Sequence, residues 1–200
     1  MSWINTISYE SATGRLKKLY DRIKGPKGVL DNVLTIHSLR PHTLEAHMTL
    51  YKAVLHHSGN TLPKWYLELL GTYVSMINKC NYCATHHAVG FKRNLGSDEK
   101  YERLMSCLAD GVYTNHLEGK YIAGIRYAKL LTIAAPDVNE SHITSLRNAN
   151  LTDGEILEIN QVVGYFNYVN RMVVGLGIDL EESDIGLSPQ SSDGDDWSHS

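Results

Sequence analysis

Apolar residues recur at spacings of three and four along nearly the whole chain, which is typical of amphipathic α-helices. The segment 41–57, for example, places Leu44, Met48 and Tyr51 on one face. The segment 63–77 has the same pattern, so we expect a helix that is buried on one side. Proline, glycine or capping residues separate the segments, and no convincing strand pattern interrupts them. The expected helices cover residues 11–23, 31–37, 41–57, 63–77, 80–95, 97–111, 117–133, 140–147 and 152–174.

This pattern predicts one all-α domain over residues 1–182 of the 200-residue chain. The remaining residues, 183–200, are polar and acidic, and we expect them to form a disordered tail. Trp197 lies in that tail.

Composition narrows the classes of function. Hydrophobic residues make up 42% and charged residues 20% of the chain, which is ordinary for a globular protein. The formal net charge of -3 gives no reason to expect a nucleic acid or an anionic membrane as partner. The first residues lack the features of a signal peptide, and no segment is apolar enough to span a membrane, so we expect a cytoplasmic protein. No motif for haem, flavin or nicotinamide is present, so no cofactor is expected.

The segment CNYCATHH carries the candidate chemistry. With only three cysteines in the chain, a disulfide framework is not expected, and a close pair in a reducing compartment is more often redox-active or metal-binding. Cys80, Cys83 and His87 lie at positions i, i+3 and i+7, so they would share one helix face. Cys80 falls at the expected helix N-terminus, where unpaired amides and the helix dipole favour a thiolate. His87 can accept a thiol proton, and once a peroxide oxidises one sulfur the other can close a disulfide.

Glu68 lies twelve residues before Cys80, on the preceding expected helix. If the two helices pack antiparallel, its carboxylate would face His87 directly or through one water, and would orient the imidazole or accept its proton. His86 points about 100° away from His87 on the helix, so we expect it to be structural or at the surface. Cys107 lies among apolar residues and is expected to be a small buried hydrophobic residue.

The arrangement of Glu68, Cys80, Cys83 and His87 resembles the signature of the alkyl hydroperoxidase AhpD-like proteins, in the carboxymuconolactone decarboxylase superfamily. The resemblance extends over residues 10–182, where LTDGEILEINQVVGYFNYVNRMVVGLGIDLE is similar to the closing helix of the peroxidase-related branch. It implies an oligomeric all-α helical bundle, commonly a trimer or hexamer, with peroxidase and disulfide reductase activity. By this resemblance Cys83 is the peroxidatic sulfur, Cys80 its disulfide partner, and His87 with Glu68 the proton relay. The implied substrate is a hydroperoxide, and the implied reductant is a dithiol. The best-known members receive electrons from a lipoylated protein.

Tyr82 departs from the better-studied members, which have a second histidine between the two cysteines. Tyrosine can donate a hydrogen bond but does not relay a proton near neutral pH. This departure bears on the efficiency of peroxidase turnover and on the lipoylated partner that the resemblance implies.

Three other interpretations of the motif stay open. The two cysteines and His87, with Glu68 or His86, could supply ligands to a metal such as zinc. A non-enzymatic redox sensor or metal-binding protein would form the disulfide or bind the metal without turnover. A decarboxylase of the carboxymuconolactone type would not need the CxxC pair. Elsewhere, on the last helix, we expect a buried polar network or a subunit contact at Asn167, Asn170 and Arg171.

Overall fold

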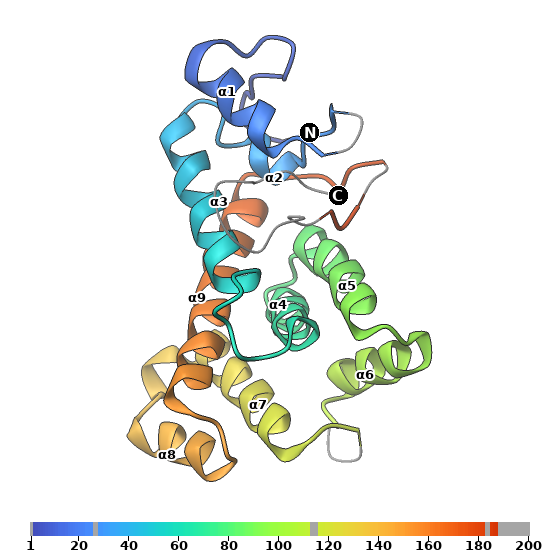
Figure 1. Cartoon of the computed structure of the whole chain (residues 1–200), viewed down its shortest axis with the longest axis vertical. Coiled ribbons are helices and arrows are strands. Elements are labelled where there is room, and N and C mark those ends of the chain that lie inside the picture. Colours follow the sequence, from blue (N-terminus) through green and yellow to red (C-terminus); the bar gives the residue numbers. More distant parts are fainter. Residues whose placement is uncertain (1, 26–27, 113–115, 183–184, 188–200) are drawn as a thin grey trace.

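The computed structural model describes residues 2–25, 28–112, 116–182 and 185–187. All regular elements in this part of the chain are helices, so the expectation of an all-α fold is confirmed (Figure 1). None of these helices is long and apolar enough to cross a membrane. The predicted tail lies outside the described residues except for 185–187, and so does Trp197. The helices are α1 (Gly14–Ile23), α2 (Asn32–Thr35), α3 (Pro41–Leu55), α4 (Lys64–Ile77), α5 (Asn81–Leu95), α6 (Asp98–Asp110), α7 (Gly119–Ile133), a short 3₁₀ helix (Ala135–Asp137), α8 (Glu140–Asn148) and α9 (Asp153–Gly175).

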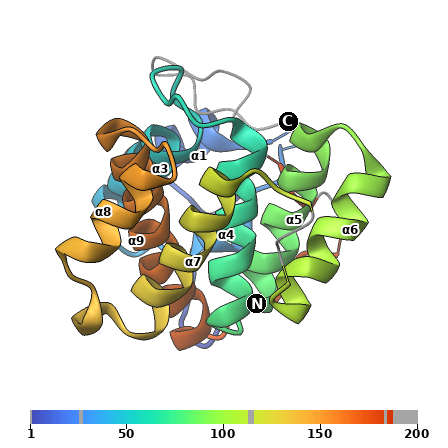
Figure 2. The same cartoon turned by 90° about the horizontal axis from the view of Figure 1, so that it is seen from below.

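Helix α4 lies at the centre of the bundle, with α5 on one side and α7 and α9 on the other (Figures 1 and 2). Every residue from Tyr66 to Ser75 is buried. The prediction that only one side of this helix is buried is therefore wrong, because neighbouring helices surround it. Two of its buried polar side chains are satisfied within the helix: Thr72 donates to the Glu68 carbonyl and Ser75 to the Gly71 carbonyl, both at 2.8 Å.

The helix ends follow the signals in the sequence. Thr152 accepts a hydrogen bond from the Glu155 amide, and the Glu155 carboxylate accepts one from the Thr152 amide, so the predicted capping box at the start of α9 is confirmed. Gly96 ends α5 in the left-handed conformation with φ of 66°. These signals fix the start of α9 and the end of α5.

The segment that follows α9 returns to the N-terminal part of the molecule. The Trp3 amide donates to the Leu176 carbonyl at 2.8 Å, and the Asn32 side chain donates to the Asp179 carbonyl at 2.9 Å. This segment therefore lies beside α2 and the start of α5, although it is distant from both in the sequence (Figure 1).

Candidate active site

The turn between α4 and α5 positions the two cysteines. Lys79 makes the turn in a left-handed conformation with φ of 55°. Cys80 is the residue immediately before α5: its amide donates to the Ser75 carbonyl, and its carbonyl accepts from the Ala84 amide, both at 2.9 Å. Cys83 follows in the first helical turn. Both residues are free thiols, with exposed fractions of only 1% and 3%.

The two thiols titrate as a pair. The Cys83 side chain, which hydrogen-bonds to Cys80, lowers the pKa of the Cys80 thiol against the effect of burial. The same interaction raises the pKa of Cys83, and burial adds to the rise. The buried Asn170 side chain on α9 favours the charged form of both thiols. When the pair holds one negative charge, that charge therefore rests on Cys80, and Cys83 keeps the proton.

Glu68 meets His87 directly, without an intervening water. The Glu68 Oε2 atom lies 2.7 Å from Nδ1 of His87, and the Glu68 side chain is almost fully buried. Burial alone would raise the pKa of Glu68, but the facing imidazole outweighs it and holds the pKa below its usual value. A carboxylate at Nδ1 fixes the imidazole so that its Nε2 atom can accept a proton.

Gly90 makes this close approach possible. It lies one turn after His87 on α5, and a Cβ added there would lie 2.8 Å from Oε1 and 2.9 Å from Cδ of Glu68. Both distances are shorter than ordinary contacts, so the absence of a side chain at this position is what lets the Glu68 carboxylate lie against α5.

Cys83 and His87 line a buried cavity between α3, α4, α5 and α9. The cavity offers about 50 Å³ to the centres of water molecules. One water needs about 10–15 Å³ by this measure, so the cavity has room for a ligand a few heavy atoms in size. Cys80 does not border this cavity; it borders a separate surface hollow with Lys79 and Val174. The remaining lining includes Asp31, His47, Tyr51, Glu68, His86, Arg93 and Tyr165.

Aromatic rings enclose the imidazole of His87. The ring of Phe166 lies edge-on at 4.5 Å between centroids, and the ring of Tyr51 at 6.3 Å. Burial raises the pKa of Tyr51 and of Tyr165 well above their ordinary value, so these phenols remain neutral. The wall of the cavity therefore holds His87 in place by packing and offers no competing phenolate.

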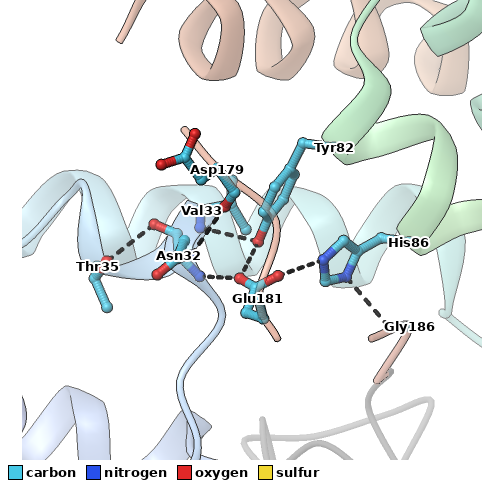
Figure 3. Close-up of polar contacts among 8 residues, drawn as sticks. All are labelled: Asn32, Val33, Thr35, Tyr82, His86, Asp179, Glu181 and Gly186. Carbon is cyan, nitrogen blue, oxygen red and sulfur yellow. Dashed lines mark hydrogen bonds and ion pairs between the residues drawn. The ribbon is translucent and has the colours of Figure 1, made fainter. Parts of the chain in front are cut away.

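A second carboxylate, Glu181, ties the C-terminal segment to α5 (Figure 3). It accepts hydrogen bonds from the Tyr82 hydroxyl at 2.6 Å and the Asn32 amide at 2.5 Å, and one of its oxygens lies 2.7 Å from His86 Nε2. Burial would raise the pKa of Glu181, but these interactions outweigh it and lower the pKa. Tyr82, which stands between the two cysteines, thus donates its hydroxyl to this carboxylate. His86 is buried and structural, since the Gly186 amide donates to its other nitrogen at 3.3 Å.

Asp31 and Glu181 are the site residues that sequence reasoning missed. Asp31 immediately precedes α2 and borders the cavity, but its side chain does not cap that helix. Both residues lie in irregular segments, where no periodicity or motif spacing marks them. Folding places the segment around Asn32 and the C-terminal segment next to α5, and this brings Asp31 and Glu181 to the site.

The other residues singled out in the sequence have structural roles. Cys107 is buried, as predicted. The polar network expected on the last helix is present, but it is buried only at Asn170: Asn78 donates to Asn167 and Asn170, and the exposed Arg171 donates to Asn167. Within the described residues, no group of three or more histidine, cysteine, aspartate or glutamate side chains has an arrangement suited to a metal ion.

A free CxxC pair at a helix N-terminus, with a glutamate-bound histidine one turn on, defines a helical thiol protein, and part of the chain is similar to a known family. Residues 41–118, which include Glu68, both cysteines and His87, match the model of the carboxymuconolactone decarboxylase family. No curated protein sequence matches the chain.

Several solved structures have a similar fold. An uncharacterized peroxidase-related protein from Silicibacter sp. TM1040 is 25% identical, with a TM-score of 0.69 over 78% of this chain and 79% of its own. An AhpD-core peroxidase-related protein from Ralstonia eutropha JMP134 is 20% identical, with a TM-score of 0.74 over 90% and 93%. The debrominase Bmp8, in a cysteine-to-alanine form with 2,3,4-tribromopyrrole, is 15% identical, with a TM-score of 0.71 over 91% and 95%. The family match therefore covers residues 41–118, and the structural neighbours show that the described chain has the AhpD-like fold.

Proposed function

We propose that this protein is a thiol-dependent peroxidase and disulfide oxidoreductase that reduces small hydroperoxides. The main support is the meeting of three features at one place: the Cys83 thiol, the Glu68-bound imidazole of His87, and a buried cavity with room for only a few heavy atoms. Cys80 supports the same chemistry, because it is already hydrogen-bonded to Cys83 and can close a disulfide with little movement.

In the oxidative step, the Cys83 sulfur attacks the terminal oxygen of the hydroperoxide. Transfer of the Cys83 proton to Cys80, along their hydrogen bond, moves the negative charge onto Cys83, which faces the cavity. An S–O bond forms as the O–O bond breaks, the sulfur is oxidised to a sulfenic acid, and the leaving oxygen takes up a proton and departs as water or an alcohol.

In the resolving step, Cys80 attacks the sulfenic sulfur of Cys83. The Cys80 proton passes through His87 to the departing hydroxide, so an S–S bond forms and water leaves. A dithiol then reduces the disulfide by exchange and restores both thiols. We propose a lipoyl-type dithiol as the first reductant to try, and a reducing, cytoplasmic setting follows from the need for such a reductant.

The test is a single-turnover reaction followed by steady-state turnover. The reduced protein is mixed with hydrogen peroxide, the remaining thiols are counted and the linkage is mapped by mass spectrometry. Peroxide consumption is then followed with dihydrolipoamide or dithiothreitol. We expect a Cys80–Cys83 disulfide and turnover in the wild type, a sulfenic acid trapped by dimedone in Cys80→Ser, and no reaction in Cys83→Ser. Cys107→Ser is the matched control, because this buried cysteine lies outside the cavity.

Each alternative gives a different result. A redox sensor would form the disulfide once but show no turnover with any dithiol. A wild-type protein whose two thiols persist in peroxide is not a peroxidase. Decarboxylation of a lactone substrate that survives Cys83→Ser would identify the other branch of the superfamily.

We also propose that the protein is a homo-oligomer, a trimer or a hexamer. Large apolar side chains are exposed on the adjacent helices α3 and α9, and burying them against another copy would be favourable. These residues are Leu50, Leu157, Tyr168 and Val174. Light scattering on the purified protein measures the mass directly, and a mass equal to one chain would refute this proposal.

A further inference from the structure

We propose that Asp31 is a further catalytic residue: the acid that delivers a proton to the leaving oxygen of the hydroperoxide. This inference rests on the peroxidase function proposed above. Asp31 lies outside residues 41–118, the segment that the family match covers, so the match assigns it no role.

Asp31 does not have the ordinary role of an aspartate before a helix. At this position an aspartate usually accepts a hydrogen bond from one of the first helix amides. Here the side chain makes no capping bond, and the Asn32 amide is bonded to Glu181 instead. The residue is only 9% exposed, and its Oδ1 atom is buried without a hydrogen-bond partner among the described residues. A buried carboxyl oxygen without a partner is costly, so its retention is best explained by a ligand that completes the bond.

Asp31 lines the same cavity as Cys83 and His87. A small molecule in contact with Cys83 therefore lies in the space that Asp31 also borders. Because the cavity has room for only a few heavy atoms, a hydroperoxide bound there has its second oxygen available to a group on the wall.

Asp31 can also hold the proton that this step requires. Burial is the largest influence and raises its pKa to about 6. His86 and His87 on α5 act in the opposite direction, and Glu181 on the C-terminal segment adds to the rise. Near neutral pH a fraction of the molecules, about 10% at pH 7, therefore carries a protonated Asp31, and an acid with a pKa close to the working pH is an efficient proton donor.

The other acidic groups on the cavity wall are less suited to this role. Glu68 has a lowered pKa and is bound to His87, so it holds no proton to give. His86 has both ring nitrogens engaged, one with Glu181 and the other with the Gly186 amide. The buried tyrosines have raised pKa values and are weak acids.

In the resulting step, the Cys83 thiolate attacks one peroxide oxygen and the proton of Asp31 moves to the other. The S–O bond forms, the O–O bond breaks, and the leaving group departs as neutral water or alcohol instead of hydroxide or alkoxide. Asp31 is left as a carboxylate and regains its proton from solvent. The sulfur loses two electrons and the peroxide gains them.

The test compares two oxidants that differ in their need for this proton. Hydrogen peroxide expels hydroxide, which needs an acid, whereas peracetic acid expels acetate, which is stable without one. We expect Asp31→Asn to slow oxidation of Cys83 by hydrogen peroxide about 100-fold. Oxidation by peracetic acid and alkylation by iodoacetamide should change little. Thiol ionisation affects both proteins alike, so the ratio of the wild-type rate to the variant rate with hydrogen peroxide should fall as the pH rises through about 6. Asp137→Asn, at an exposed aspartate, is the matched control.

The results separate this inference from the peroxidase proposal. If the wild type reacts with hydrogen peroxide but Asp31→Asn reacts equally fast, the acid role is wrong. If the variant loses its reaction with both oxidants and with iodoacetamide, Asp31 is a structural residue and the inference is again wrong. If the wild type itself does not react with hydrogen peroxide, the proposed function fails, and the acid role fails with it.

Discussion

The substitution Gly90→Ala tests the geometry of the Glu68–His87 pair without removing either residue. The added Cβ would lie 2.8 Å from the Glu68 Oε1 atom, whereas ordinary contacts begin at 3.4 Å, so the carboxylate must retreat by about 0.6 Å. If it retreats away from α5, its 2.7 Å contact with His87 lengthens to about 3.3 Å, beyond the usual hydrogen-bond range. Hydrogen bonds that involve a charged group contribute about 1.5–3 kcal/mol. We therefore expect peroxide-driven disulfide formation to slow tenfold or more.

The stability of the Gly90→Ala variant provides a second measurement. Overpacking costs about 1–3 kcal/mol, and the better helix propensity of alanine offsets about 1 kcal/mol of it. Gly164→Ala on α9 is the matched control, because a Cβ there has no neighbour within 4 Å and the change should stabilise the helix. The assays are urea unfolding and stopped-flow oxidation by hydrogen peroxide. A Gly90→Ala protein as stable and as reactive as Gly164→Ala would refute the view that Glu68 must lie against α5.

Three other outcomes follow from the structure. Glu181→Gln should make the stability of the protein less dependent on pH in the acid range, as measured by thermal unfolding across pH. The lowered pKa of Glu181 stabilises the fold above pH 4.5, the pKa of the unfolded state, and this stabilisation is lost as the pH falls through the pKa of the folded state. Asp31→Asn should raise the free energy of unfolding by up to about 3 kcal/mol at pH 7.5 but not at pH 3.5. The reason is that the raised pKa of Asp31 favours the folded state at low pH, and this advantage is lost as the pH rises through about 6. Equal shifts at both pH values would contradict this. Thr152→Ala removes a helix cap and should cost about 1 kcal/mol in urea unfolding with no change in peroxide rate, so a slower reaction would show that the start of α9 affects the site.

The parts of the site that could be predicted are those fixed by local geometry. Cys80, Cys83 and His87 belong to one helical segment, and a turn of only a few residues joins that segment to the helix of Glu68. A short connection between two helices forces them to pack side by side, so the direct Glu68–His87 contact was among the arrangements expected. The capping box of α9 was predictable for the same reason, since it involves residues three apart.

The parts that could not be predicted depend on contacts between distant segments. The Asn32 amide and Glu181 are 149 residues apart in the chain, and nothing in the helical pattern indicates that these segments meet. The full burial of α4 was also hidden, because Glu68, Thr72 and Ser75 resemble a solvent-exposed face in the sequence. Their polar groups are satisfied by backbone carbonyls or by His87, which only the packed structure reveals.

The position of Glu181 has a consequence for the order in which the protein is completed during synthesis. The thiol pair and its histidine are translated well before Glu181, and Tyr82 and His86 lack their carboxylate partner until Glu181 has left the ribosome. A nascent or C-terminally shortened chain would therefore carry the cysteines without the contacts that enclose them. Any truncation of the protein should therefore retain Glu181.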